Sequence, residues 1–217
     1  MAEDAAKSLF IAGGIGITPL WCMIQRLVAL KKPFELIYCV RTRKEAALLE
    51  KLQETAKLPN AKITFNFDGE PGGKMLDIKA VAAAASPDTH LYCCGPLPML
   101  GAFEEATKGM PAERVHLEYF TAKEAPAAEG GFTVVLARTG KTFQIAPGKT
   151  ILETLLDAGL DVPSSCLEGV CGTCETKVLE GIPDHRDVVL TEAERQANKT
   201  MMICCSGSKS EKLVLDL

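Results

Sequence analysis

Residues 164–174 have the sequence SSCLEGVCGTC, which places three cysteines close together with glycines between them. Gly169 and Gly172 allow the backbone to curl around these side chains. A fourth candidate lies in MMICCSGS, residues 201–208, where two cysteines are adjacent. Taken with the first of these two, the cysteines follow the spacing C-x₄-C-x₂-C…C: Cys166, Cys171, Cys174 and Cys204.

This spacing is typical of a plant-type 2Fe–2S cluster, in which two sulfide-bridged irons need four thiolates. A zinc ribbon usually has two C-x₂-C pairs, and only Cys171 and Cys174 form one here. A redox-active dithiol would leave Cys166 and the loop glycines unexplained. Glycines and polar residues between the thiols do not resemble a hydrophobic core. The sequence therefore predicts an iron–sulfur centre.

The composition is that of an ordinary globular protein. The 217 residues are 47% hydrophobic and 24% charged, and the net charge of −4 gives no reason to expect nucleic acid as a partner. No apolar run approaches the ~20 residues that cross a bilayer, so no membrane association is expected. The acidic start MAEDAAKS does not resemble a signal peptide. The odd cysteine count of nine indicates reduced thiols and a cytoplasmic location.

The first half of the chain alternates between short β-rich runs and helical patterns. The predicted strands are SLFIA, ELIYCV, KITFNF, HLYCC and VHLEY, and the predicted helices are 19–30, 44–58, 77–85 and 98–108. This alternation predicts an α/β domain over residues 1–120, with a parallel sheet and helices on both faces.

Residues 121–131, TAKEAPAAEGG, have no apolar period and are predicted to be a linker. Residues 132–217 then differ in character and predict a small α+β domain. Its features are a hairpin turn at 138–140, an amphipathic helix at 150–160, further strands at 175–181 and 212–217, and a capping box between Thr191 and Glu194. The run 184–187, DHRD, is interpreted as a polar surface turn before a short helix.

Two motifs in the first half suggest a nucleotide site. AGGIGITPL, residues 12–20, follows a strand and opens a helix, a place suited to anion binding. YCCGPLPML, residues 92–100, ends another strand, where ligands gather in open α/β sheets. Either motif alone can be a simple turn with no ligand. The candidate binding residues in them are Gly13, Gly14, Gly16, Thr18, Pro19, Cys94, Gly95 and Pro96.

The motifs SSCLEGVCGTC, GIPDHRDVVL, ICCSGS and LVLDL make residues 132–217 similar to a plant-type ferredoxin domain of the β-grasp fold. More narrowly, they resemble the C-terminal domain of phthalate dioxygenase reductase-like proteins. The resemblance implies that Cys166 and Cys171 hold one iron, and that Cys174 and Cys204 hold the other. Cys205 takes the place of an apolar residue usual in that family, which implies that it is a neighbour of the cluster.

GGIGITP and YCCGPLPML together resemble the pyridine-nucleotide domain of the ferredoxin-reductase superfamily, over about residues 8–120. That resemblance implies that the glycine loop holds a pyrophosphate, and that the segment from Cys94 to Pro96 lies by the nicotinamide. Arg41 and Arg43 would lie near the adenosine ribose, where two arginines could favour a 2′-phosphate; the family preference nevertheless implies NADH. In the family, an aromatic residue at the place of Phe120 packs against a flavin.

The family also places a flavin-binding barrel with an Arg-x-Tyr-Ser type motif before the nucleotide domain. No such motif occurs in this sequence, and NADH gives up two electrons while the cluster accepts one. We therefore expect a piece of a three-domain reductase, inactive with NADH alone, whose FMN lies on a separate domain.

By the resemblance, its partner would be a Rieske-type oxygenase acting on aromatic rings. Two alternatives remain at this point. One is a non-catalytic ferredoxin-like carrier with an interaction domain, and the other is a zinc-stabilised binding module. Nucleotide affinity would separate the reductase from the carrier, and a colourless protein would indicate zinc.

Overall fold

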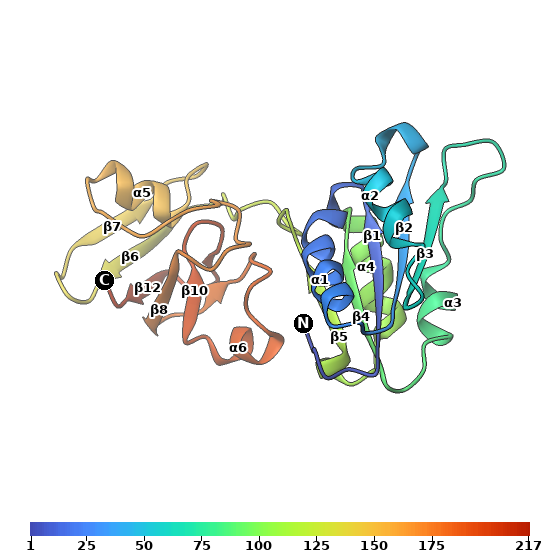
Figure 1. The fold of residues 1–217 in the computed structure, drawn as a ribbon. Coiled ribbons are helices and arrows are strands. Elements are labelled where there is room, and N and C mark those ends of the chain that lie inside the picture. Colours follow the sequence, from blue (N-terminus) through green and yellow to red (C-terminus); the bar gives the residue numbers. More distant parts are fainter. The chain divides into compact units, whose positions relative to one another are not determined.

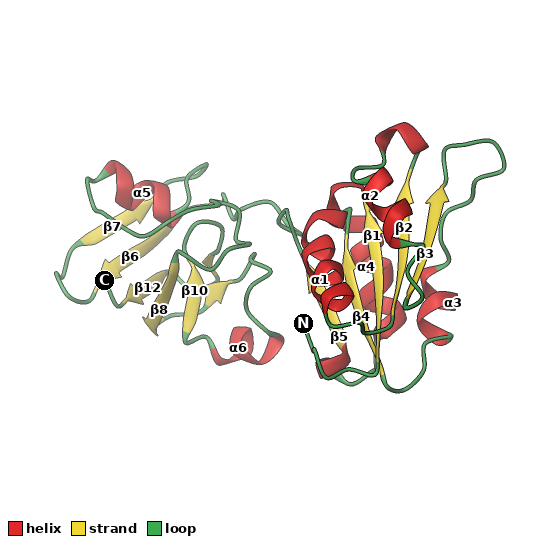
Figure 2. Cartoon of the chain, in the orientation of Figure 1, coloured by secondary structure: helices red, strands yellow, loops and turns green.

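A computed structural model describes residues 1–217 (Figures 1 and 2). The chain divides into two compact units, Met1–Tyr119 and Phe120–Leu217, and each is described by itself. No helix in either unit combines the length and the apolar character needed to cross a membrane.

The first unit is built on a sheet of five strands that are all parallel. Their order is β3-β2-β1-β4-β5. The bounds are β1 (Lys7–Gly13), β2 (Phe34–Val40), β3 (Ala61–Phe67), β4 (Thr89–Cys94) and β5 (Val115–Glu118). The strand order reverses at β1. The chain first adds β2 and β3 on one side of β1, and then adds β4 and β5 on the other side. A crevice at the carboxyl ends of these strands is the expected ligand position in such a sheet.

Alternate residues of the strands face two separate cores, which explains their almost continuous apolar sequences. Helices α1 (Ile17–Ala29) and α2 (Leu49–Thr55) cover Phe10, Leu36 and Tyr38 on one face. Helices α3 (Ile78–Ala83) and α4 (Leu97–Thr107) cover the other, where the buried residues include Leu9, Ile11, Ile37 and Leu91. The predicted parallel sheet with helices on both faces is confirmed.

The helix predicted over residues 44–58 begins later than expected. Residues Arg43–Glu45 form a single 3₁₀ turn (η2), and Leu48 has a left-handed backbone, φ 60°, just before α2 starts. The backbone N–H of Ala47 donates to the Tyr38 hydroxyl at 3.1 Å. This bond ties the segment to Tyr38 of β2, and the left-handed backbone at Leu48 interrupts the predicted helix. Two further 3₁₀ turns, η1 (Gly14–Gly16) and η3 (Ala112–Arg114), lie in the same unit.

The second unit contains a mixed five-stranded sheet in the order β10-β8-β12-β6-β7, in which only β6 and β12 are parallel. The strands are β6 (Phe132–Leu136), β7 (Thr142–Ile145), β8 (Glu175–Glu180), β10 (Thr200–Met202) and β12 (Lys212–Leu215). A second pair, β9 (Pro183–Asp184) and β11 (Gly207–Ser208), forms a small separate sheet. Strands β9, β10 and β11 were not predicted, because runs this short carry no period in the sequence.

The two helices of this unit begin at capping boxes. α5 (Ile151–Asp157) is capped by Thr150 with Glu153, and α6 (Glu192–Ala197) by Thr191 with Glu194. The second box was predicted, whereas the first was not. The buried residues of α5 pack with the sheet into one core. The predicted hairpin between β6 and β7 is present, with Gly140 at φ 68°.

Much of the segment predicted as a linker is bound to the second unit. Ala127 is buried, and its N–H donates to the carbonyl of Cys205 at 2.8 Å. Glu124 accepts from Arg186 at 3.1 Å, and the N–H of Gly131 donates to Ile145 at 2.8 Å. A sequence without apolar period can therefore still be fixed by backbone hydrogen bonds.

The turn η1 lies very close to the end of β4 at Gly16. A Cβ on Gly16 would stand 2.1 Å from the carbonyl oxygen of Cys94, a backbone atom that cannot move aside easily. We expect Gly16→Ala to lower the free energy of unfolding by about 1–3 kcal/mol, as overpacking does. Thermal or urea unfolding measures it.

Gly101→Ala in α4 is the matched control, because its Cβ would meet no atom within 4 Å. Alanine is favoured over glycine in a helix by about 1 kcal/mol, so this variant should be slightly stabilised. Equal stability of the two variants would contradict the contact between Gly16 and Cys94.

Candidate functional site

The cysteine-rich loop has no regular secondary structure and runs from the end of α5 to the start of β8. Its backbone turns through left-handed conformations at Leu167 (φ 62°), Gly169 (φ 69°) and Gly172 (φ 78°). The two glycines adopt these angles readily, while Leu167 is a strained position that the sequence did not indicate. These turns wrap the loop around the sulfur of Cys166.

The four predicted thiols come together as two pairs. The hydroxyl of Thr173 and then the neighbouring Cys166 lower the pKa of Cys171, and the neighbouring Cys204 raises the pKa of Cys174, so Cys166 lies near Cys171 and Cys204 near Cys174. The backbone N–H groups of Glu168 and Val170 each point at the Cys166 sulfur from 3.4 Å. The loop therefore presents N–H donors to a sulfur, as expected for a site that holds a negatively charged group.

The two pairs differ in exposure. Cys171 is exposed, and the hydroxyl of Thr173, 3.2 Å from its sulfur, lowers the pKa of Cys171 to about 6. Cys174 and Cys204 are buried. The hydrogen bond with Cys204, followed by burial, raises the pKa of Cys174. One pair thus faces solvent and the other faces the interior.

This arrangement fits a two-iron cluster better than a single ion. No three His, Cys, Asp or Glu side chains converge on one point that could hold a metal ion. A 2Fe–2S cluster needs two thiolates at each of two irons, and the observed pairing supplies two and two. The residues present therefore suit the cluster, with the loop N–H groups placed to stabilise its charge.

The DHRD run is not the surface turn that the sequence suggested. The Asp187 side chain is fully buried, and that of His185 is 8% exposed. One carboxylate oxygen of Asp187 accepts from the N–H groups of Val189 at 3.0 Å and Leu190 at 2.8 Å. The guanidinium of Arg195 lies 4.0 Å from the same oxygen. The buried carboxylate of Asp187 therefore holds residues 187–190 in place, and this segment supports the cysteine loop through the bond from Val188 N–H to the Gly169 carbonyl.

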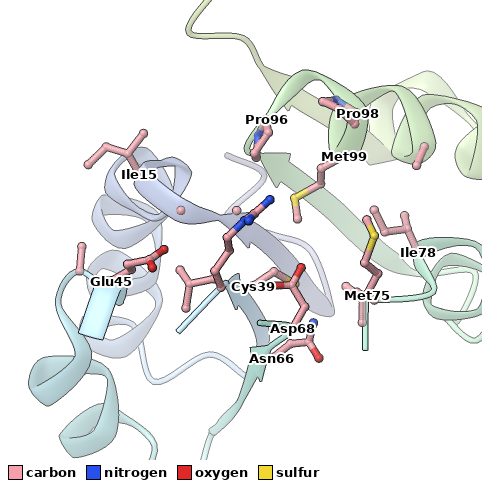
Figure 3. A pocket seen from close by; sticks show the side chains of 17 residues that line it. Ile15, Cys39, Glu45, Asn66, Asp68, Met75, Ile78, Pro96, Pro98 and Met99 are labelled. Atoms are coloured by element: carbon pink, nitrogen blue, oxygen red, sulfur yellow. The ribbon is translucent and has the colours of Figure 1, made fainter. Parts of the chain in front are cut away.

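The first unit has a cavity of about 630 Å³ at the carboxyl ends of β1, β2, β3 and β4 (Figure 3). Four predicted binding residues line it, namely Gly13, Gly14, Arg41 and Pro96. Asn66 and Asp68 lie on its β3 side, and Glu45 and Ile15 also line it. Its position matches the crevice expected from the strand order.

The glycines of the first loop have two different roles. Gly14 lines the cavity with φ 53°, and a Cβ there would meet no atom within 4 Å. Gly16 is buried away from the cavity, and its missing Cβ makes room for Cys94. Gly16 therefore shapes the loop by packing, instead of leaving room for a pyrophosphate as its motif suggested. A Cβ on Gly95 would similarly stand 2.7 Å from the Met99 sulfur.

Several other predicted residues lie outside the cavity lining. The Thr18 hydroxyl donates to the carbonyl of Ile15 at 2.9 Å, which stabilises the glycine loop. Pro19 lies in the first turn of α1. Cys94 is buried, and burial raises its pKa to about 11. Phe120, at the start of the second unit, is 42% exposed.

The two predicted arginines separate. Arg41 lines the cavity, whereas the guanidinium of Arg43 lies 4.8 Å from the ring centroid of Phe67. Two carboxylates, Glu45 and Asp68, also line the cavity and were not predicted. Asp68 directly follows β3, and Glu45 lies in the 3₁₀ turn after β2. Neither residue belongs to a motif that would have set it apart in the sequence.

Tyr38 is a further residue that the sequence analysis missed. It is buried, its hydroxyl donates to the carbonyl of Gly14 at 3.1 Å, and it accepts from the N–H of Ala47. Tyr38 thus links the glycine loop to the segment after β2. The sequence shows it only as one more apolar strand residue.

Comparison with known proteins adds to this geometry. Residues 10–105 match the family described as oxidoreductase NAD-binding domain, and residues 134–208 match the 2Fe-2S iron-sulfur cluster binding domain. Phenoxybenzoate dioxygenase subunit beta of Ectopseudomonas oleovorans is 57% identical over 99% of this chain and 66% of its own. Tetrachlorobenzoquinone reductase of Sphingobium chlorophenolicum is 49% identical over 100% and 68%.

Among solved structures, phthalate dioxygenase reductase is 38% identical with a TM-score of 0.66, over 100% of this chain and 67% of that one. It is described as a modular structure for electron transfer from pyridine nucleotides to a 2Fe–2S centre. The chain spans about two thirds of the length of these relatives. It belongs to the phthalate dioxygenase reductase-like family of oxygenase reductases, NAD(P)H-dependent oxidoreductases in which an NAD-binding domain is followed by a 2Fe–2S ferredoxin domain.

Proposed function

We propose that this chain carries electrons from NADH, by way of an FMN on a separate domain, to its 2Fe–2S cluster and on to a Rieske-type oxygenase that acts on aromatic rings. The observation that carries the proposal is the cysteine loop, in which two backbone N–H groups point at the Cys166 sulfur and Cys174 is buried, as is the distant Cys204. These residues would hold the cluster, which when bound supplies one-electron transfer. The nine free cysteines support a reducing compartment, the cytoplasm.

The lining of the cavity supports NADH over NADPH. A 2′-phosphate would bring about two further negative charges toward a cavity that already carries the carboxylates of Glu45 and Asp68. Arg41 is the single guanidinium that lines it, because Arg43 stacks on Phe67. The ribose hydroxyls of NADH can instead donate hydrogen bonds to a carboxylate.

A flavin on a separate domain is proposed on chemical grounds. NADH releases a hydride, which is two electrons on one atom, and the cluster takes electrons singly. No side chain of this chain accepts a hydride and releases single electrons. The residues of this chain would hold the nicotinamide at the cavity and hold the cluster in the thiol loop.

A second candidate acceptor is a small quinone. The relative named tetrachlorobenzoquinone reductase is 49% identical to this chain over all of the present 217 residues. Stopped-flow oxidation of the reduced cluster by a chlorinated benzoquinone and by a Rieske-type oxygenase would separate the two acceptors.

The first prediction of this proposal concerns the ligands. Serine in place of Cys166, Cys171, Cys174 or Cys204 should abolish or severely weaken cluster binding, because each change removes a thiolate from iron. Iron and sulfide content and the visible spectrum measure the loss. Cys205→Ser is the matched control and should keep the cluster. Bleaching by Cys205→Ser with retention by Cys204→Ser would reverse the assignment of the fourth ligand.

The second prediction concerns the nucleotide. Arg41→Ala should weaken NADH binding roughly tenfold to a hundredfold, since a hydrogen bond to a charged group contributes about 1.5–3 kcal/mol. Arg43→Ala removes the same charge from the same loop but not from the cavity lining, so its affinity should stay near wild type. Calorimetry with both variants tests this, and equal weakening would argue against the cavity as the site.

The third prediction concerns the flavin. Under anaerobic conditions NADH should leave the cluster of the 217-residue chain oxidised, while dithionite should reduce it. Fusion of a family flavin domain at the N-terminus should restore fast reduction by NADH, followed as bleaching in the visible spectrum. Fast bleaching by NADH in protein shown to be free of flavin would contradict the need for a flavin.

A further inference from the structure

The side chains of the cavity are poorly matched to the two phosphates of a dinucleotide. One guanidinium, that of Arg41, lines the cavity together with two carboxylates, those of Glu45 and Asp68. A diphosphate adds two negative charges, so this lining needs further hydrogen-bond donors. Backbone N–H groups at the start of a helix are donors of this kind. Gly14 and Ile15, in the turn before α1, both line the cavity.

Tyr38 is hydrogen-bonded to two separate segments of the cavity wall. Its side chain is fully buried, and its hydroxyl donates to the carbonyl of Gly14 at 3.1 Å. The N–H of Ala47, which lines another part of the wall, donates to the same hydroxyl at 3.1 Å. Burial raises the pKa of Tyr38, so the hydroxyl keeps its proton near neutral pH and remains a donor.

The bond from Tyr38 fixes the orientation of the peptide group between Gly14 and Ile15. A trans peptide group is planar, and its C=O and N–H point in opposite directions. Because the Gly14 carbonyl is turned toward the buried hydroxyl of Tyr38, the N–H of Ile15 points to the opposite side of the turn. Gly14 has φ 53° and is conformationally free, so its peptide group needs such a restraint. Apart from Tyr38, the N–H of Ile17 in the same turn donates to this carbonyl.

We propose that Tyr38 is a positioning residue of the nucleotide site, which holds the peptide between Gly14 and Ile15 so that the Ile15 N–H donates to the diphosphate of the dinucleotide. The inference rests on the proposed binding of NADH in this cavity. Tyr38 does not itself line the cavity and acts through the peptide group. Through Ala47, the same hydroxyl also restrains the segment that carries Glu45, so one side chain connects the two walls.

The test compares Tyr38→Phe with Tyr92→Phe in the whole chain. Both tyrosines are buried in the same core, but Tyr92 does not line the cavity, and its hydroxyl accepts from the N–H of Ala2 at 2.9 Å. Tyr92→Phe therefore controls for the loss of a buried hydroxyl. In calorimetry, Tyr38→Phe should weaken NADH binding about two- to tenfold, the effect of one neutral hydrogen bond. Tyr92→Phe should bind NADH as the wild type does.

A second measurement reports the Ile15 N–H directly and needs only the wild type. In protein labelled with ¹⁵N at isoleucine, the Ile15 amide should be among the NMR signals that move most on addition of inorganic pyrophosphate, because a charged acceptor makes a strong hydrogen bond. Ile15→Val identifies the signal by its disappearance. At saturation with pyrophosphate, the shift should be smaller in Tyr38→Phe than in the wild type.

The outcomes separate this inference from the proposed function. Unchanged NADH affinity in Tyr38→Phe, or equal weakening in Tyr92→Phe, overturns the role of Tyr38, while weakening by Arg41→Ala leaves the cavity standing as the nucleotide site. An Ile15 signal that does not respond to pyrophosphate overturns the inference in the wild type alone, whether or not the variants fold. If the wild type binds no NADH, the proposed nucleotide site fails and the inference fails with it.

Discussion

The close approach at Gly169 is the constraint on which the thiol site depends. Gly169 is buried, its carbonyl accepts from the N–H of Val188 at 3.0 Å, and its Cα lies against Asp187 and Cys205. Any side chain here would push the cysteine loop off the segment that supports it. The loop can then no longer bring Cys166, Cys171 and Cys174 toward Cys204, which follows β10 in another part of the unit. The buried charge of Asp187 follows from the same need, because it ties that segment together.

A glycine also allows a close backbone approach in the first unit, here between the turn η1 and the end of β4. The turn η1 that follows β1 must lie against the end of β4, and Gly16 permits this by making room for the Cys94 carbonyl. Tyr38 then links the glycine loop to the segment after β2. Apolar side chains such as Met75 and Met99 make up much of the cavity lining, and Arg41 and Asp68 contribute its charge.

The sequence predicted what periodicity and spacing encode, and missed what depends on tertiary contact. The strands of the first unit have continuous apolar runs because both faces are buried, so their positions could be predicted. The cysteine spacing indicated a cluster because a metal centre restricts spacing strongly. Asp187 was misinterpreted because a run of four polar residues resembles a surface turn, and its burial depends on Arg195 and two backbone N–H groups. The role of Gly16 was likewise hidden, since its neighbour Cys94 is distant in the chain.

The two thiol pairs differ in exposure to solvent, so negative charge is stabilised to different extents on the two sides of the site. An added electron is best stabilised where solvent and N–H donors can respond to its charge. Cys171 is exposed, and the sulfur of its partner Cys166 faces two backbone N–H groups. Cys174 and Cys204 are buried, where an added charge is costly. A cluster held by these four thiols would therefore carry the charge of its reduced state mainly on the Cys166 and Cys171 side, next to solvent. The buried side anchors the site in the core of the unit.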